Sequence, residues 1–162
     1  MRQWVLIRVQ RNQFLRTLAE VAENFVAPRQ PVGVLGVIVN RDGHVLVAHH
    51  ATRPHEPWGL PGGWLSTGEV PEEGILREVA EELDTPVVLE RYVGAHEHDY
   101  GRFRPHGLTL VYRLASTLTD HDEVLPRSWE VIRTRWVSVE EACGMAPQSS
   151  TRIREAVGAV LA

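Results

Sequence analysis

The sequence predicts an α/β fold, in which a mixed β-sheet lies between helices. Segments with the apolar patterns of β-strands are interspersed irregularly with segments whose apolar residues recur at helical spacing. Irregular alternation of this kind is typical of a mixed sheet covered by helices. The chain has 162 residues, of which 43% are hydrophobic and 23% charged, and this fits one globular domain with a real core.

An amphipathic helix is predicted to begin at Asn12, within an N-terminal helical extension over residues 1–31. Its apolar positions recur at helical spacing, and two prolines end it. This apolar face could pack on the flank of the domain itself, on a second copy in a homodimer, or on a membrane or another partner. The apolar residues are Leu15, Leu18, Val21, Ala22 and Phe25, and the prolines are Pro28 and Pro31.

Residues 32–162 are predicted to form the main domain, which opens with two antiparallel strands. Residues 32–39 form a nearly continuous apolar run, as expected of a buried strand, and residues 45–48 return antiparallel. The Asp42-Gly43 pair between them is the signature of a hairpin turn.

A helix is predicted over residues 71–83. Pro71 suits the first helical position, where its missing N–H would have no intrahelical partner. Glu72 and Glu73 then fall in the first turn, where the helix dipole favours negative charge. Three apolar residues share one face at spacings i, i+3 and i+7, and we expect this face in the core. They are Leu76, Val79 and Leu83.

A second face of this helix carries three carboxylates, those of Glu78, Glu81 and Glu82, at spacings i, i+3 and i+4. Like charges at this spacing destabilise a bare helix, and only Arg77 offers a nearby positive charge. The plain interpretation is a solvated surface helix. The alternative is a bound cation, and hard oxygen ligands would select Mg²⁺ or Mn²⁺ rather than zinc.

Further strands and helices are predicted beyond this helix. Ser138, with Glu141 three residues on, predicts the capped start of a short helix. A polar, aromatic and basic loop over residues 95–107 could contact a substrate or could be a solvated hairpin tip. The predicted strands are 87–96, 108–118 and 131–137, an acidic loop covers 119–130, and a last helix covers 151–161.

The residues around the acidic helix follow a fixed spacing. They are Gly63, Glu69, Arg77, Glu78, Val79, Glu81 and Glu82. This spacing resembles, without a gap, the Nudix box, which is the signature of the Nudix hydrolases. The segment from Glu130 through Trp136 to Ala142 resembles the C-terminal part of Nudix domains, so the resemblance covers roughly residues 32–145.

The end of the box departs from the family pattern. Asp84 and Thr85 stand where the family usually has Gly and an aliphatic residue. That Gly caps the helix in a left-handed conformation, which Asp is among the few other residues to tolerate. We therefore interpret the change as structural, although it leaves a reduced activity open.

The resemblance implies a Nudix-like α/β/α sandwich and a site that binds Mg²⁺ or Mn²⁺. Matching positions make Glu78, Glu81 and Glu82 metal ligands, often joined by the carbonyl of Gly62. Glu78 also matches the general base of some members. Arg77 and Glu69 match a pair that orients the ligand carboxylates from behind.

For the remaining metal ligand and for the substrate contacts, the resemblance gives several candidates. The family often adds a carboxylate from a later loop, for which Glu130, Glu123 and Glu97 are candidates, with Glu130 preferred. An Arg before the Trp-x-x-Pro-Gly-Gly run often contacts phosphates in the family, and Arg53 has this place. The other candidate substrate contacts are Tyr100, Arg102 and Phe103, whose aromatic members could stack on a base.

The composition of the chain restricts its partners and its cellular compartment. The net charge is −4 and no Lys/Arg run occurs, which argues against a large nucleic-acid footprint. The lone Cys143 offers no disulfide framework and fits a reducing cytoplasm. No signal-peptide pattern or membrane-spanning run is recognised.

The predicted function is metal-dependent hydrolysis of a diphosphate linkage in a nucleoside diphosphate joined to another group, by in-line attack of an activated water. Three alternatives stay open: a catalytically weak Nudix-like binding or regulatory module, an isopentenyl diphosphate isomerase, and an RNA 5′-end pyrophosphohydrolase.

Overall fold

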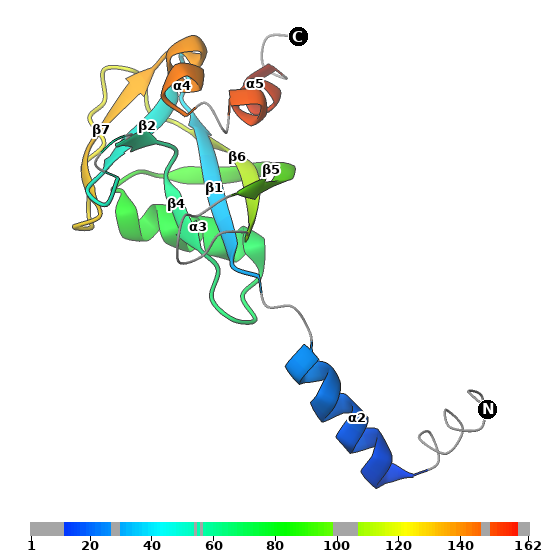
Figure 1. Ribbon diagram of the computed structural model, residues 1–162. Coiled ribbons are helices and arrows are strands. Elements are labelled where there is room, and N and C mark those ends of the chain that lie inside the picture. The colour runs from blue at the N-terminus through cyan, green and yellow to red at the C-terminus, as the bar shows by residue number, and fades with distance from the viewer. Residues whose placement is uncertain are drawn as a thin grey trace. The chain divides into compact units, whose positions relative to one another are not determined.

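The computed structural model describes residues 12–26, 30–53, 55, 57–98, 107–146 and 150–158 (Figure 1). The chain divides into two compact units, residues 1–30 and 31–162, and each is described by itself. No helix in the described part of the chain is long and apolar enough to cross a membrane.

The first unit contains helix α2 (Gln13–Val26), close to the helix expected from Asn12. The side-chain oxygen of Asn12 accepts hydrogen bonds from the N–H groups of Phe14 and Leu15, at 3.0 and 3.3 Å, and so caps the helix. Phe14, Leu18 and Val21 are exposed within the structure.

In the second unit, the described strands form one mixed seven-stranded sheet. Its path runs β3-β2-β1-β6-β5, with β4 also paired to β1 and β7 to β2. Strands β1 and β6 are parallel, and the other pairings are antiparallel. The strands are β1 (Val32–Val39), β2 (Val45–His50), β3 (Trp58–Gly59), β4 (Gly62–Trp64), β5 (Val87–His98), β6 (Gly107–Ser116) and β7 (Val131–Val137).

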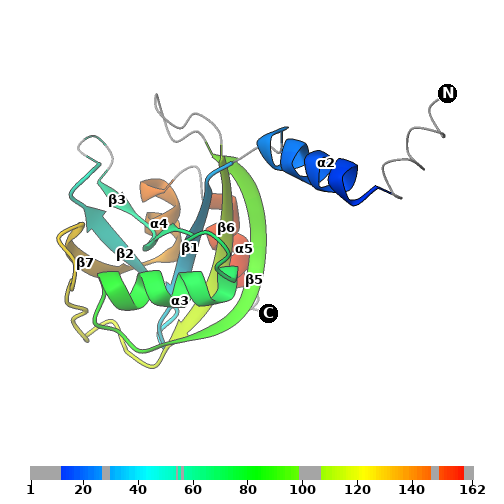
Figure 2. The same cartoon turned by 90° about the horizontal axis from the view of Figure 1, so that it is seen from below.

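Helices cover both faces of the sheet, which confirms the predicted α/β/α arrangement (Figures 1 and 2). Helix α3 (Pro71–Glu82) lies on one face. Helices α4 (Val139–Met145) and α5 (Ser150–Gly158) lie on the other. Ser138 caps α4 as predicted, since its hydroxyl accepts a hydrogen bond from the N–H of Glu141 at 3.2 Å.

The two-residue repeat of the strands divides the core between these faces. Along β1, Val34 and Ile38 belong to the cluster packed under α3, whereas Val37 and Val39 belong to the cluster under α4 and α5. Strand β2 alternates in the same way, with Ala48 on the α3 face. Each strand therefore assigns its successive side chains to opposite layers.

Two details of α3 differ from the sequence prediction. Ile75, not Leu76, packs beneath the helix together with Val79 and Leu83, whereas Leu76 is 36% exposed. The sheet lies under the i, i+4, i+8 row of the helix, and sequence periodicity alone left two neighbouring rows possible.

The end of α3 also differs, because the expected left-handed cap is absent. Among the described residues only glycines have positive φ. Leu83 is extended, and the chain beyond it pairs with the acidic loop. Asp84 donates its N–H to the Leu125 carbonyl, and Arg127 donates its N–H to the Glu82 carbonyl. The loop, rather than a local turn, therefore satisfies the helix end.

Candidate active site

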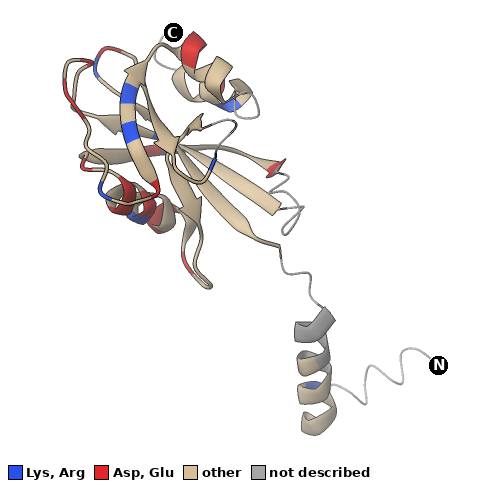
Figure 3. Ribbon diagram, turned by 60° about the vertical axis from the view of Figure 1, so that its left-hand side comes forward, with Lys and Arg blue, Asp and Glu red and all other residues tan. Residues whose placement is uncertain are grey.

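Acidic residues are dense on α3 and recur on the loop that precedes β7 (Figure 3). Arg77 holds several of them together. Its guanidinium forms a two-pronged pair with Glu69, at 2.7 and 2.9 Å, and donates to Glu78 at 2.9 Å and to Glu81 at 3.2 Å. It also donates to the carbonyl of Trp64 on β4, at 3.1 Å. Arg77 thereby ties α3 to the sheet while it orients two predicted ligand carboxylates.

Glu69 is fixed from both sides. Besides Arg77, it accepts a hydrogen bond from the N–H of Ser66 at 2.8 Å. These hydrogen bonds, chiefly those from Arg77, lower the pKa of Glu69 to about 2. Glu69 therefore remains a carboxylate at any working pH and keeps Arg77 in place.

Glu82 is the most buried of the predicted ligands, with 4% of its surface exposed. Its carboxylate accepts a hydrogen bond from the N–H of Gly62 at 3.0 Å. Burial nevertheless raises its pKa to about 7, and the neighbouring charges of Glu78 and Glu130 add to this effect.

Glu78 lies against the backbone of β4. A Cβ atom at Gly63 would lie 2.4 Å from Oε2 of Glu78, so only glycine leaves room for this carboxylate. Burial raises the pKa of Glu78, and the charges of Glu81 and Glu130 act in the same direction. Glu81 differs from its neighbours because its side chain is 59% exposed.

The C-terminal end of β2 positions Arg53 and Glu130. The N–H of Ala51 donates to the Glu130 carbonyl at 2.8 Å, which fixes the start of β7 beside this end. Arg53 lowers and Glu130 raises the pKa of Glu82, so both charges lie within electrostatic reach of that buried carboxylate.

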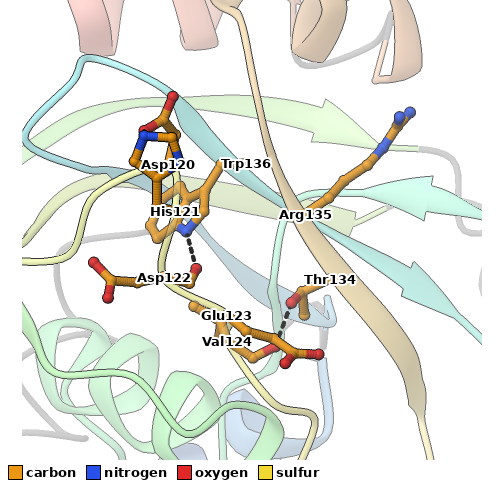
Figure 4. Close-up of a pocket in the computed structure, with 8 residues that line it drawn as sticks. All are labelled: Asp120, His121, Asp122, Glu123, Val124, Thr134, Arg135 and Trp136. Atoms are coloured by element: carbon orange, nitrogen blue, oxygen red, sulfur yellow. Dashed lines mark hydrogen bonds and ion pairs between the residues drawn. The ribbon is translucent and has the colours of Figure 1, made fainter.

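The other candidate ligands and substrate contacts lie away from this cluster or outside the described residues. Glu97 is exposed near the end of β5. Tyr100, Arg102 and Phe103 lie outside the described residues. Glu123 lines a separate pocket of about 270 Å³ by the acidic loop (Figure 4). Trp136 also lines that pocket, and its indole N–H donates to the Asp122 carbonyl at 3.0 Å.

The donor set suits a hard divalent cation. Within the described residues no three acidic, His or Cys side chains already surround a common metal position. The chemistry of the set nevertheless fits, because the buried carboxylate of Glu82 and the half-buried carboxylate of Glu78 have raised pKa values, and a divalent cation would stabilise both as anions. Glu81 is exposed on the same helix and held only at its tip by Arg77.

Several supporting groups gave no sequence signal of their own. The carbonyl of Trp64 and the N–H of Gly62 are backbone atoms, which contact the charged cluster only after β4 pairs with β1. The N–H of Ser66 is a backbone atom as well, and it contacts Glu69 three residues further along the chain. His50 is a further neighbour of the site that no sequence motif marks. It is 5% exposed and its Nε2 lies 3.3 Å from the Leu60 carbonyl.

Comparisons with known proteins identify the family and the fold. The NUDIX domain family description matches residues 29–157. A MutT-like protein of Streptomyces ambofaciens is 38% identical over 127 residues, which cover 72% of this chain and 81% of that protein. The NAD-capped RNA hydrolase NudC of Photorhabdus laumondii is 25% identical over 130 residues, which cover 79% of this chain and 46% of that protein.

The fold is shared with solved structures as well. The NUDIX domain of Shewanella oneidensis NrtR, solved with ADP ribose, superposes with a TM-score of 0.65 at 22% identity, covering 85% of this chain and 96% of that one. The chain belongs to the Nudix family, as its sequence motif predicts. Within that family it is a Nudix hydrolase of the pyrophosphate-cleaving kind.

Proposed function

We propose that this chain hydrolyses the diphosphate linkage of a nucleoside diphosphate joined to another group, with Mg²⁺ or Mn²⁺ as cofactor. The observation that carries the proposal is the buried carboxylate of Glu82, which lies close enough to Glu78 and Glu130 for their charges to raise its pKa. Burial and mutual repulsion disfavour the charged forms of these carboxylates. Their grouping is best explained by a cation that they bind in the working enzyme.

The metal ligands in this proposal are Glu78, Glu81 and Glu82, with the Gly62 carbonyl and Glu130 completing the set. Glu130 is preferred to Glu123 because its charge acts on both Glu78 and Glu82, whereas Glu123 lines the pocket of Figure 4. A bound divalent cation would neutralise phosphate charge and lower the pKa of a coordinated water.

The chain's own residues divide the remaining work. Glu78 is proposed as the base that takes the proton of the attacking water, because its carboxylate is partly desolvated and its pKa is raised. Arg77 orients Glu78 and Glu81 through the hydrogen bonds that it donates to their carboxylates, and Glu69 holds Arg77. Arg53 would neutralise phosphate oxygens at the rim of the cluster.

The cellular setting is part of the same proposal. A buried, unpaired Cys143 fits a reducing cytoplasm. The substrate is proposed to be a free nucleotide derivative rather than a long nucleic acid, because the net charge of −4 offers little attraction to a polyanion.

The test is a hydrolysis screen with Mg²⁺ or Mn²⁺. It covers nucleoside triphosphates, nucleotide sugars, CDP-alcohols, ADP-ribose, dinucleoside polyphosphates and RNA with a 5′-triphosphate. Chromatography separates the products, because cleavage of most of these substrates gives phosphate monoesters rather than inorganic phosphate. Glu82→Gln is run beside the wild type, with Glu73→Gln as the matched control, because Glu73 is an exposed glutamate on the same helix.

We expect one substrate class to be cleaved by the wild type and by Glu73→Gln but not by Glu82→Gln. Turnover that survives in Glu82→Gln at saturating metal would contradict the assignment of the site. No cleavage of any substrate by folded, metal-bound wild type would contradict the proposed activity and favour a binding module.

A further inference from the structure

The end of β2 and the start of β3 form a feature that the Nudix motif does not explain. Strand β3 pairs with β2 so that Gly59 lies opposite Ala48 and Trp58 lies opposite His49. Directly opposed residues of antiparallel strands project to the same face. Ala48 belongs to the core beneath α3, so Gly59 also faces the α3 side, where the carboxylates lie.

Trp58 shows the opposite orientation and confirms this register. It packs against the core beneath α4 and α5. On that face the guanidinium groups of Arg133 and Arg135 lie 5.2 and 4.6 Å from its ring centre, and His49 meets its edge at 5.1 Å. The two neighbours in β3 therefore serve different faces of the sheet.

The space beside Gly59 is taken by Arg53. A Cβ atom on Gly59 would lie 2.7 Å from Nη1 of Arg53 and 3.8 Å from the ring of His50. The ring of His50 is itself fixed, because the Leu60 carbonyl accepts a hydrogen bond from its Nε2–H and the His50 N–H donates to the Pro57 carbonyl at 2.7 Å. The guanidinium of Arg53 therefore lies against the backbone of Gly59, next to the ring of His50, which is restrained by its hydrogen bond.

The charge of Arg53 reaches the site from this position. It lowers the pKa of Glu82 and contributes to the lowered pKa of His50. Both groups lie on the α3 side of the sheet, so Arg53 extends from the hairpin after β2 toward the carboxylate cluster.

We propose that Gly59 is a positioning residue: its missing side chain forms a seat that holds the guanidinium of Arg53 at the rim of the carboxylate cluster, where it contacts the phosphates of a nucleoside diphosphate. This inference rests on the proposed function for the ligand class. The seat itself rests only on the strand register and on the close approach of Arg53 to Gly59.

The substitution Gly59→Ala tests the seat without a large change in the fold. In Gly59→Ala the added methyl meets the flexible end of an exposed side chain, so Arg53 can move away without disturbing the core. Gly144→Ala is the matched control, because a Cβ there meets nothing within 4 Å. We expect both variants to unfold cooperatively near the wild-type midpoint.

The first measurement is the Nε–Hε resonance of Arg53 in ¹⁵N-labelled protein without ligand, assigned by its loss in Arg53→Lys. Gly59→Ala should shift this resonance, and Gly144→Ala should leave it in place. An unchanged resonance in Gly59→Ala would overturn the seat, whatever the protein binds.

The second measurement is the affinity for ADP with Mg²⁺, by titration calorimetry. Loss of a hydrogen bond to a charged group predicts a roughly tenfold weaker affinity in Arg53→Ala and a roughly three- to tenfold weaker one in Gly59→Ala. In Arg53→Ala the further change Gly59→Ala should have no effect.

The outcomes separate the two proposals. Additive losses in the double variant would show that Gly59 acts on the backbone rather than through Arg53, and would overturn the positioning role. Absence of ADP binding by the wild type would count against the proposed ligand class, and with it against the phosphate contact of Arg53, while the resonance still decides whether the seat exists.

Discussion

The burial of Glu82 lowers the stability of the metal-free fold but suits the binding of a cation. The Glu82 carboxylate accepts a hydrogen bond from one backbone N–H, and its pKa is raised to about 7, chiefly by burial and further by the charges of Glu78 and Glu130. A residue in this position weakens the metal-free fold whenever it is charged. The arrangement is reasonable only in a protein that recovers this free energy when it binds a cation.

The burial of Glu82 predicts how stability depends on pH without metal. The pKa of Glu82 is raised from an ordinary 4.5 to about 7, so the folded state binds more protons than the unfolded state between these values. The contribution of Glu82 to the free energy of unfolding is therefore full below pH 4.5 and is lost as the pH rises to 7.

Glu82→Gln removes this dependence. In EDTA, we expect it to be more stable than the wild type above pH 7, by roughly 1–3 kcal/mol, and to lose that advantage by about pH 4.5. Denaturant titrations at several pH values measure the difference, with Glu73→Gln as control. A gap between Glu82→Gln and the wild type that is equal at both ends of the range would disprove the role of burial.

For Glu69 we expect the opposite dependence of stability on pH. Its pKa is lowered from 4.5 to about 2, so its contribution to stability is present above pH 4.5 and is lost as the pH falls toward 2. Glu69→Gln should therefore be less stable than the wild type at neutral pH, and the two should converge near pH 2. The same denaturant titrations test this, and a gap that widens in acid would refute it.

At the scale of elements, α3 is positioned by backbone groups from outside the helix. Strand β4 supplies the carbonyl of Trp64 to Arg77 and the N–H of Gly62 to Glu82. The acidic loop supplies the partners at the helix C-terminus. The site is therefore a contact between α3 and β4, and its geometry depends on how closely β4 approaches β1.

Gly62 sets that approach. Its φ is 137°, and a Cβ atom there would lie 2.1 Å from the carbonyl oxygen of Val34. We expect Gly62→Ala to lower the free energy of unfolding by about 3 kcal/mol or more, since backbone strain adds to a clash with backbone.

Gly68→Ala is the control for strain alone. Gly68 also has positive φ, at 80°, but a Cβ atom there meets nothing within 4 Å. It should cost only about 1 kcal/mol. Urea titrations of both variants give the comparison, and equal losses would show that the close approach of β4 to β1 is unimportant.

At the scale of the whole molecule, the described site and both core clusters lie in residues 31–162. Removing residues 1–30 should therefore leave one cooperative unfolding transition and a turnover within about twofold of the full chain. Calorimetry and the hydrolysis assay test this, and a truncated chain that is folded but inactive would place a site residue in the extension.

Light scattering on the same two samples addresses the apolar face of α2, where Phe14, Leu18 and Val21 are exposed within the structure. A mass that falls by more than half on truncation assigns this face to a homodimer. A mass that changes only by the deleted residues assigns it to the chain's own domain or to a different partner.

The sequence by itself determined most of the helices and strands and the acidic character of α3. Strand alternation, the Asp42-Gly43 turn, Pro71 and the Ser138 cap act within a few residues of one another, so each could be recognised locally. The spacing of the box likewise identified the family and the pairing of Glu69 with Arg77.

Only the tertiary structure decided which of these residues are buried and what they contact. It placed Ile75 rather than Leu76 in the core, ended α3 on the acidic loop instead of a left-handed Asp84, and brought Glu130 and Arg53 within reach of Glu82. Strands β3 and β4 likewise depend on partners far along the chain. Strand register and desolvation arise between distant segments, and no local pattern of residues specifies them.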